Sequence, residues 1–225
     1  MVKFILGATM ALVLAACGGG SDEASQVTTP PPVVVSQSSV PPACMPKVVS
    51  VGLLGDSTDL GLTLVDGAYV VAPHNPGVEL QADMDAEFGA GAVIVTDYGV
   101  GGTNATQAPT VKADVIVANY GINDSAIHEP LDIYKAAMLA TGATLIETQN
   151  PGADDPGDGV AGPYAAAARS LGLPVADTMA YVESLPNWRS MLSDGLHPSD
   201  ALYVLIIDNV LAPAVAKQVA PLRCR

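Results

Sequence analysis

Basic residues are scarce in this sequence, and their scarcity excludes several classes of function. Only 9 of the 225 residues are Lys or Arg, against 23 Asp or Glu, which gives a formal net charge of −14. Nucleic-acid binding needs a basic face that releases counterions, and a polybasic membrane-surface protein needs clustered Lys and Arg. We therefore expect no nucleic-acid partner and no electrostatic attraction to an anionic membrane surface.

Aromatic residues are also few, at 4% of the chain, so the aliphatic side chains of Ala, Val and Leu must form the core. Hydrophobic residues nevertheless make up 49% of the sequence. A chain of this length and composition buries enough apolar surface to fold as one domain of ordinary size. Wholesale disorder is thereby excluded.

The first 16 residues have the pattern of an export signal. Lys3 is their only charged residue, and the apolar run 4–14 that follows is too short to span a bilayer comfortably. The tetrapeptide Leu-Ala-Ala-Cys that ends at Cys17 resembles the lipobox of bacterial lipoproteins, in which the cysteine is acylated and begins the mature chain. The resemblance implies a signal peptide over 1–16, lipidation of Cys17 and an exported protein anchored on a membrane of the bacterial cell envelope, at its periplasmic or cell-surface face. An ordinary signal peptide with a nearby cysteine is the alternative.

Residues 17–45 are rich in Gly, Ser, Thr, Gln and Pro, which is typical of a flexible tether. The folded domain is therefore expected over 46–225. Besides Cys17, the chain has one cysteine near each end of this domain, Cys44 and Cys224. In an oxidising compartment an even pair favours a disulfide, and domain termini often lie close together. We predict a Cys44–Cys224 bridge; two unpaired thiols in frayed termini are the alternative.

Short apolar runs alternate with helical segments from residue 47 onward. Five runs rich in β-branched residues are expected to be strands: 48–54, 92–96, 114–119, 143–148 and 173–177. Four segments are expected to be helices: 78–88, 131–140, 164–171 and 198–219, the last kinked or broken at Pro213. Continuous apolar strands are typical of a parallel sheet buried on both faces. The alternation predicts an α/β fold with a mainly parallel sheet, whose ligands bind at the carboxyl ends of the strands.

Several polar residues with catalytic potential stand next to these predicted elements. Ser57 follows the first strand, in a turn that we expect to lead into a helix. A serine hydroxyl is a weak nucleophile and needs a base within hydrogen-bond reach. Of the three histidines, only His197 has a carboxylate, Asp194, three residues before it on a turn-like segment, where it can hold the imidazole tautomer. His74 and His128 are expected to be surface-turn and loop residues.

Two further residues offer N–H donors for such a site. Gly102 lies in a glycine-rich loop after the second strand and has no side chain to block its backbone N–H. Asn123 follows the third strand and offers a side-chain amide. With the backbone N–H of Ser57, these donors would form a three-point oxyanion hole for a tetrahedral intermediate.

These residues resemble the SGNH hydrolases, also called the GDSL esterase/lipase family, which is named for a Ser, a Gly, an Asn and a His in four separate blocks. In this chain the four residues are matched, in that order, by Ser57, Gly102, Asn123 and His197. Asp194 matches the family's acid. The resemblance implies a flavodoxin-like three-layer α/β/α sandwich around a mainly parallel sheet. It also implies ester hydrolysis through an acyl-serine intermediate. That chemistry needs no metal and no organic cofactor, and the acidic run 154–159 lacks the spacing of a calcium-binding loop.

Two positions depart from the family pattern. Thr58 stands where the family's nickname has Leu, and Asp97 opens the second block where the family often has Asn. The second departure leaves a choice among Gly99, Gly101 and Gly102, of which we take Gly102. Neither departure removes a catalytic group.

The sequence therefore predicts an exported serine hydrolase of carboxylic esters. Short-chain esters or acetyl esters of carbohydrates, whether small molecules or polysaccharides, are favoured because aromatics are few and no long apolar lid is evident. An O-acyltransferase of envelope sugars on the same triad and a non-catalytic surface-binding lipoprotein are alternatives. An α/β-hydrolase elbow is disfavoured, because its Gly-x-Ser-x-Gly pattern needs glycine where Asp59 stands. Taken singly, Ser57 and the Asp194–His197 pair are also explained as caps of helices.

Overall fold

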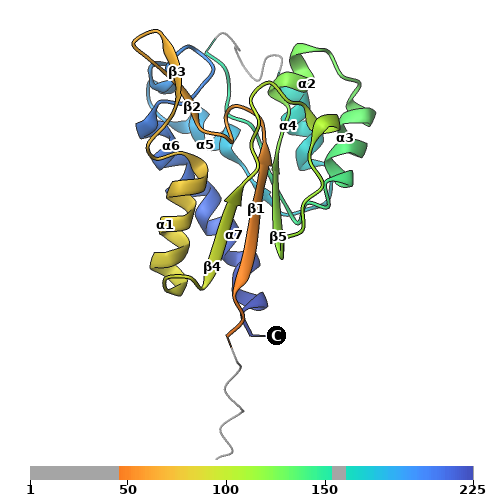
Figure 1. Cartoon of the computed structure of the whole chain (residues 1–225). Coiled ribbons are helices and arrows are strands. Elements are labelled where there is room, and N and C mark those ends of the chain that lie inside the picture. Colours follow the sequence, from red (N-terminus) through yellow and green to blue (C-terminus); the bar gives the residue numbers. More distant parts are fainter. Residues whose placement is uncertain (1–45, 154–160, 225) are drawn as a thin grey trace, which may run out of the picture. The chain divides into compact units, whose positions relative to one another are not determined.

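A computed structural model describes residues 46–153 and 161–224, which form a parallel sheet between two layers of helices (Figure 1). The strand order is β4-β1-β5-β6-β7, and each neighbouring pair is parallel. The strands are β1 (Val49–Gly55), β4 (Val93–Asp97), β5 (Val115–Asn119), β6 (Leu145–Glu147) and β7 (Val175–Ala176). The expected α/β class and its parallel sheet are confirmed, although β6 and β7 are shorter than predicted.

Helices cover both faces of this sheet. One face packs against α1 (Pro76–Phe88), α6 (Asp200–Ile206) and α7 (Ala212–Val219), and the other against α3 (Leu131–Ala140) and α4 (Gly162–Arg169). Short helical segments among the described residues include η1 (Ala105–Gln107), α2 (Ile122–Ala126), α5 (Thr178–Ser184), η3 (Trp188–Met191) and η5 (Ala220–Leu222). The layers match the expected three-layer sandwich.

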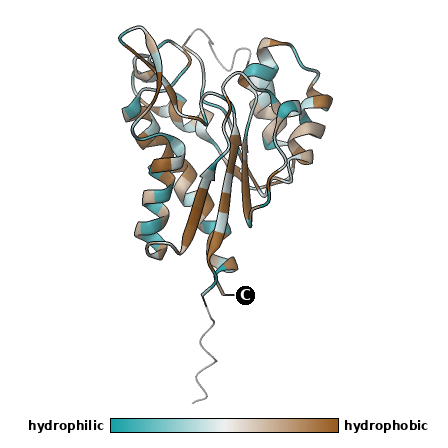
Figure 2. Cartoon of the chain, in the orientation of Figure 1, coloured by the Kyte–Doolittle hydropathy of each residue, from teal (hydrophilic) through white to brown (hydrophobic). Residues whose placement is uncertain are grey.

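The central strand β1 contributes to both cores because its side chains alternate across the sheet. Val51 and Leu53 lie in the cluster with α1 and α7, whereas Leu54 lies in the cluster with α3 and α4. All three are at most 1% exposed. Figure 2 shows the hydrophobic residues concentrated in β1, β4 and β5, as a sheet covered on both faces requires.

The last helix contains a π-helical segment in place of a simple break at Pro213. α6 continues through η4 (Ile207–Leu211) into α7, in which Pro213 is the second residue. Pro213 has no N–H to donate to a carbonyl of the preceding turn. The wider π-helical turn before it accommodates the carbonyl that is left without a helical partner. By length and hydropathy Asp200–Leu222 passes as a membrane span, but 44% of its apolar window is buried inside the domain. Ile207 and Val215 belong to the core beside β1, so the segment is a core helix.

The prediction of a helix directly after Ser57 is wrong. The chain makes one turn, closed by a hydrogen bond of 3.0 Å from the Leu60 N–H to the Asp56 carbonyl. The turn ends at Gly61, whose φ of 78° is left-handed and cannot continue a right-handed helix.

An unexpected hairpin follows that turn. Its strands β2 (Leu62–Val65) and β3 (Ala68–Val71) pair antiparallel in a separate two-stranded sheet. The connecting residues Asp66 and Gly67 have φ of 49° and 81°. Positive φ at both positions of a two-residue loop is the type I′ turn for which Asp-Gly is favoured. The Asp-Gly dipeptide is therefore a local sequence signal for this hairpin, although the predictions of strands and helices relied on apolar periodicity and did not use it.

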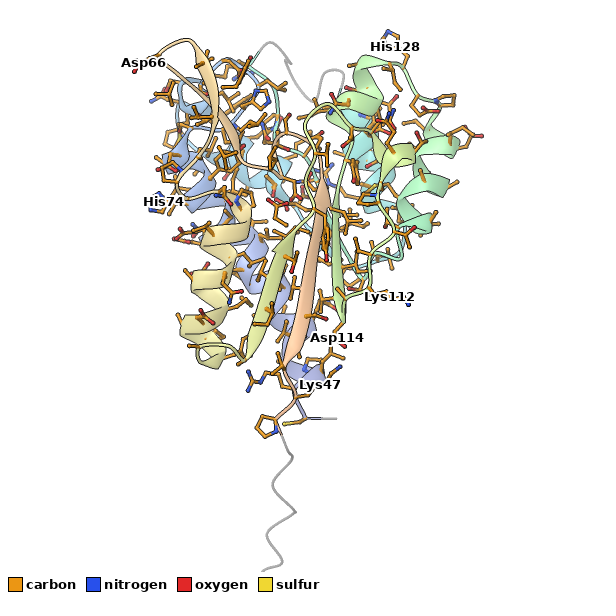
Figure 3. All side chains as sticks on the ribbon, in the orientation of Figure 1. Lys47, Asp66, His74, Lys112, Asp114 and His128 are labelled. Atoms are coloured by element: carbon orange, nitrogen blue, oxygen red, sulfur yellow. The ribbon has the colours of Figure 1, made fainter. Side chains whose placement is uncertain are left out.

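The two ends of the domain lie side by side at the amino edge of the sheet. The Lys47 N–H donates to the Arg223 carbonyl over 2.9 Å, and the Lys47 ammonium pairs with Asp114, as Figure 3 shows at this edge. Cys224 is disulfide-bonded. Cys44, its predicted partner, lies outside the described residues, as does Cys17, so the pairing and the N-terminal boundaries stay predictions.

A buried carboxylate stands at the carboxyl end of β6. Glu147 is 4% exposed and accepts a hydrogen bond of 2.7 Å from the Thr178 hydroxyl. Burial raises the pKa of Glu147 to about 7, against the opposing effect of hydrogen bonds from Thr178 and Asn119. Between pH 4.5 and about pH 7, Glu147 is therefore protonated in the folded protein, whereas it is ionised in the unfolded chain, where its pKa is 4.5.

We predict that Glu147→Gln changes the pH dependence of stability. Because the folded pKa is raised, the stability associated with Glu147 is fully present below pH 4.5 and is lost as the pH rises through 7. A neutral glutamine does not charge, so the variant should gain on the order of 3 kcal/mol relative to wild type between pH 5 and pH 8. Urea unfolding at both pH values measures this gain. The exposed Glu87→Gln is the control, and an equal change in both variants would contradict the prediction.

Candidate active site

A continuous chain of hydrogen bonds joins three of the residues singled out in the sequence. The Nε2 atom of His197 lies 2.9 Å from the Ser57 Oγ, and its Nδ1 atom lies 2.7 Å from the Asp194 Oδ2. Ser57 comes from the turn after β1, and Asp194 and His197 come from the turn before α6; His197 follows Ser57 by 140 residues. The structure thus brings a hydroxyl, an imidazole and a carboxylate together at the carboxyl edge of the sheet, in the order of a serine hydrolase triad.

Asp194 is held by four donors. Its Oδ1 accepts the backbone N–H groups of Leu196 at 2.9 Å and of His197 at 2.7 Å. Its Oδ2 accepts from the His197 Nδ1 and from the Tyr69 hydroxyl, the latter at 2.8 Å. Partial burial alone would raise the pKa of Asp194, but the bonds from His197, Leu196 and Tyr69 outweigh burial and hold it well below its usual range. The carboxylate is therefore ionised and fixed when it faces the imidazole.

The turn that carries Ser57 is fixed by the preceding residue. Asp56 is fully buried and accepts from the Thr58 N–H at 2.9 Å and from the Thr58 hydroxyl at 3.0 Å. Before it, Gly55 passes so close to β5 that an added Cβ would lie 2.8 Å from the Asn119 carbonyl oxygen. The turn therefore needs a residue without a side chain at Gly55 and a carboxylate at Asp56. Together they place Ser57 at the carboxyl edge of the sheet, where it is 9% exposed.

The glycine-rich loop after β4 lies against the same turn. The Val100 N–H donates to the Gly55 carbonyl over 3.0 Å, and a Cβ added to Gly101 would lie 3.8 Å from the Cβ of Ser57. Gly102 has a φ of 78° and open space where a Cβ would be. Among the described residues, the N–H groups of Ser57 and Gly102 donate to no protein acceptor. Both are thus available as donors to a substrate oxygen.

Asn123 reaches the same place from the start of α2, but its amide is engaged. Its Nδ2 donates to the Asp56 Oδ2 at 3.1 Å and to the Thr103 carbonyl at 2.9 Å. These bonds join the segment after β5 to the turn that carries Ser57 and to the glycine-rich loop after β4. A substrate oxygen would have to compete with them for an N–H, so the role of Asn123 in an oxyanion hole stays a prediction.

Neither of the other histidines takes part in this chain of hydrogen bonds. His74 pairs with Asp200 through a contact of 2.8 Å at the surface, and the hydrogen bond that the imidazole donates to this carboxylate raises the pKa of His74. His128 is an exposed loop residue with a φ of 54°. Figure 3 shows the two on opposite sides of the molecule. The structure places both outside the triad.

Further carboxylates lie buried beneath the triad. Asp59 is 1% exposed, and neither of its oxygens has a hydrogen-bond partner among the described residues. Burial, and then the neighbouring Asp97, Glu147 and Asp56, raise the pKa of Asp59 well above its usual value. Within 46–153 and 161–224, no group of three or more His, Cys, Asp or Glu side chains could hold a metal ion.

Sequence reasoning missed Tyr69, which contacts both Asp194 and His197. Its ring lies 5.3 Å from the imidazole ring, centroid to centroid, at an interplanar angle of 65°. No spacing rule pointed to this residue, because it contacts the site from the hairpin that was not predicted. The Asp-Gly turn between two apolar runs was the signal that could have revealed the hairpin.

No protein-family model matches the chain, and no curated protein matches it. Solved structures do match. A lipase/acylhydrolase from Enterococcus faecalis is 19% identical with a TM-score of 0.57 and aligns over 77% of this chain and 96% of its own. A catalytic mutant of an acetylxylan esterase from Geobacillus stearothermophilus is 18% identical with a TM-score of 0.54, over 76% and 94%. A carbohydrate acetylesterase family member from Sinorhizobium meliloti is 16% identical with a TM-score of 0.58, over 77% and 100%.

At these identities the likeness concerns the three-dimensional arrangement. The matching arrangement is a central parallel sheet of five strands flanked by helices, and it covers the whole or nearly the whole of each matched protein. The described domain therefore has the three-layer α/β/α fold of the SGNH hydrolases.

Proposed function

We propose that this chain is a serine hydrolase of carboxylic esters. The observation that carries the proposal is the chain of hydrogen bonds from Asp194 through His197 to Ser57. It lies at the edge of the sheet where this class of fold binds its ligands. The fold is one that it shares with acylhydrolases and acetylesterases.

In the proposed reaction His197 acts first as a base and then as an acid. Its Nε2 takes the hydroxyl proton as the Ser57 Oγ forms a bond to the ester carbonyl carbon, and Asp194 stabilises the imidazolium. The N–H groups of Ser57 and Gly102 stabilise the negative charge on the carbonyl oxygen. His197 then gives the proton to the departing alcohol, which leaves an acyl-serine. Water, deprotonated by the same imidazole, attacks this ester, releases the acid and restores the serine.

The matched acetylxylan esterase supports this assignment of roles. Its catalytic mutants carry alanine in place of a serine, an aspartate or a histidine, and the aspartate precedes the histidine by three positions. Asp194 and His197 have the same spacing in this chain.

The substrate that we propose is a short acyl ester, in particular an acetyl ester of a carbohydrate. Three grooves formed by the described residues, of about 650, 470 and 340 Å³, are lined by residues other than the triad. None of these three grooves therefore supplies an acyl pocket for Ser57, and a small acyl group needs none. Two of the matched structures are acetylxylan and carbohydrate acetyl esterases. The net charge of −14 disfavours strongly anionic substrates by repulsion.

We predict that the full-length chain hydrolyses p-nitrophenyl acetate faster than p-nitrophenyl octanoate. Ser57→Ala removes the nucleophile and should lower kcat by at least about a thousandfold. It should also abolish labelling by a fluorophosphonate probe. Ser190→Ala, at an exposed serine of η3, is the control and should keep both activities.

Two results would contradict this proposal. Folded wild-type protein that neither hydrolyses acetyl esters nor reacts with the probe would favour the non-catalytic surface protein. Transfer of the acetyl group to added sugars in preference to water would favour the acyltransferase.

We further propose that the chain is an exported lipoprotein anchored through Cys17. The support is the sequence pattern of residues 1–17 and the tether-like composition that follows. Two or more acyl chains give the stable anchoring that one chain does not.

Cys17→Ser is predicted to lose its lipid. The wild-type chain should incorporate labelled palmitate in bacterial cells and sediment with the membranes, whereas the variant should be unlabelled. Ser21→Ala, four residues later, is the matched control. Palmitate incorporation by the Cys17→Ser variant would disprove lipidation at this residue.

A further inference from the structure

The β2–β3 hairpin connects the two segments that supply the triad. It follows the Ser57 turn directly, and it is bonded to the turn that carries Asp194 and His197. The Leu64 N–H donates to the Ser193 Oγ over 2.9 Å, and Ser193 in turn donates through its N–H to the His197 carbonyl over 2.8 Å. The hairpin is therefore placed to influence the geometry of the acid–base pair.

A second bond fixes the hairpin on the helix side. The Tyr203 hydroxyl of α6 donates to the Leu62 carbonyl over 2.9 Å. Tyr203 is buried at 2% exposure, so this anchor belongs to the core. The first strand of the hairpin is thus rigidly supported, although the side chains of β3 are exposed along its whole length.

Tyr69 extends from β3 onto the triad. Its hydroxyl donates to the Asp194 Oδ2 at 2.8 Å, and its ring packs edge-on against the His197 ring with centroids 5.3 Å apart. The side chain is nevertheless 58% exposed. Burial therefore does not explain its conformation, and the two contacts with the acid and the base do.

Among the described residues, Tyr69 is the one donor to Asp194 that lies outside the turn 194–197. The bonds within the turn set the carboxylate relative to its own backbone. The bond from Tyr69 sets it relative to the hairpin, which is continuous with the Ser57 turn. Figure 3 shows Asp66, at the hairpin tip, at the outer edge of the molecule, and Tyr69 follows it by three residues on β3.

We propose that Tyr69 is a positioning residue of the triad. Its hydroxyl fixes the Asp194 Oδ2, and its ring restricts the rotation of the His197 imidazole, so that Nε2 stays directed at Ser57. This inference rests on the ester hydrolysis proposed above. Tyr69 acts through Asp194 and His197, and it takes no proton from the substrate.

The phenol also limits how strongly Asp194 holds the protonated imidazole. Within 46–153 and 161–224, the titratable groups facing His197 are Asp194, Tyr69 and the buried Asp56 beneath Ser57. A donor on Oδ2 draws negative charge away from the bond to Nδ1. Without it, the carboxylate binds the imidazolium more tightly.

The test compares Tyr69→Phe, which keeps the ring, with Tyr69→Ala, which removes both contacts. Tyr181→Phe on α5 is the matched control, because it removes a tyrosine hydroxyl elsewhere. With p-nitrophenyl acetate, Tyr69→Phe should lower kcat about tenfold with KM within about twofold of wild type. The acid limb of its kcat/KM profile should move to higher pH, and Tyr69→Ala should lose more activity. Rates are divided by the active-site concentration from fluorophosphonate titration, which corrects for unfolded protein.

A second measurement does not depend on turnover. The proton on the His197 Nδ1 gives a low-field NMR signal when it is shared with Asp194, and Tyr69→Phe should shift this signal further downfield while Tyr181→Phe leaves it in place. A Tyr69→Phe variant with unchanged kcat, pH profile and Nδ1 signal would overturn the inference, even if its melting temperature falls. An inactive wild-type protein would refute the proposed hydrolysis instead, and the NMR comparison would then decide the role of Tyr69 by itself.

Discussion

The hydrogen bonds to the Asp194 carboxylate are the constraint on which the site depends. Two backbone N–H groups fix one oxygen, and the imidazole of His197 and the phenol of Tyr69 share the other. A carboxylate with four donors stays ionised and does not rotate, so the imidazole beside it has one orientation. Ser57 is then within 2.9 Å of a ring nitrogen whose tautomer is already set. The remaining structure supplies the scaffold that brings these groups to one edge.

That scaffold is the parallel sheet. Because all five strands run in one direction, the segments after β1, β4 and β5 meet at the same edge, although they are far apart in the sequence. The hydrogen bonds of Asn123 to Asp56 and to Thr103 join these three segments directly. A core built mainly of aliphatic residues holds them, with β1 buried on both faces.

The sequence was informative where residue type and spacing carry the signal. Apolar runs predicted the five strands, and four short motifs predicted which side chains meet at their ends. The hairpin was missed because its strands are short and largely exposed, so they lack the pattern of a buried strand. Tyr69 was missed with it, because no motif or spacing in the sequence links an exposed tyrosine to Asp194. The engagement of the Asn123 amide was also unpredictable, because it depends on the exact placement of a backbone carbonyl at Thr103.

The meeting of the domain's two ends has a consequence for how the molecule is presented to its surroundings. Lys47 and Arg223 are hydrogen-bonded at the amino edge of the sheet, and Ser57 lies beyond the far end of β1. The seven residues of β1 separate the two edges by about 20 Å. The chain therefore enters the domain on the side opposite Ser57. An attachment upstream of Lys47 would therefore leave the edge that carries Ser57 free, because the entry of the chain and this serine lie at opposite ends of β1.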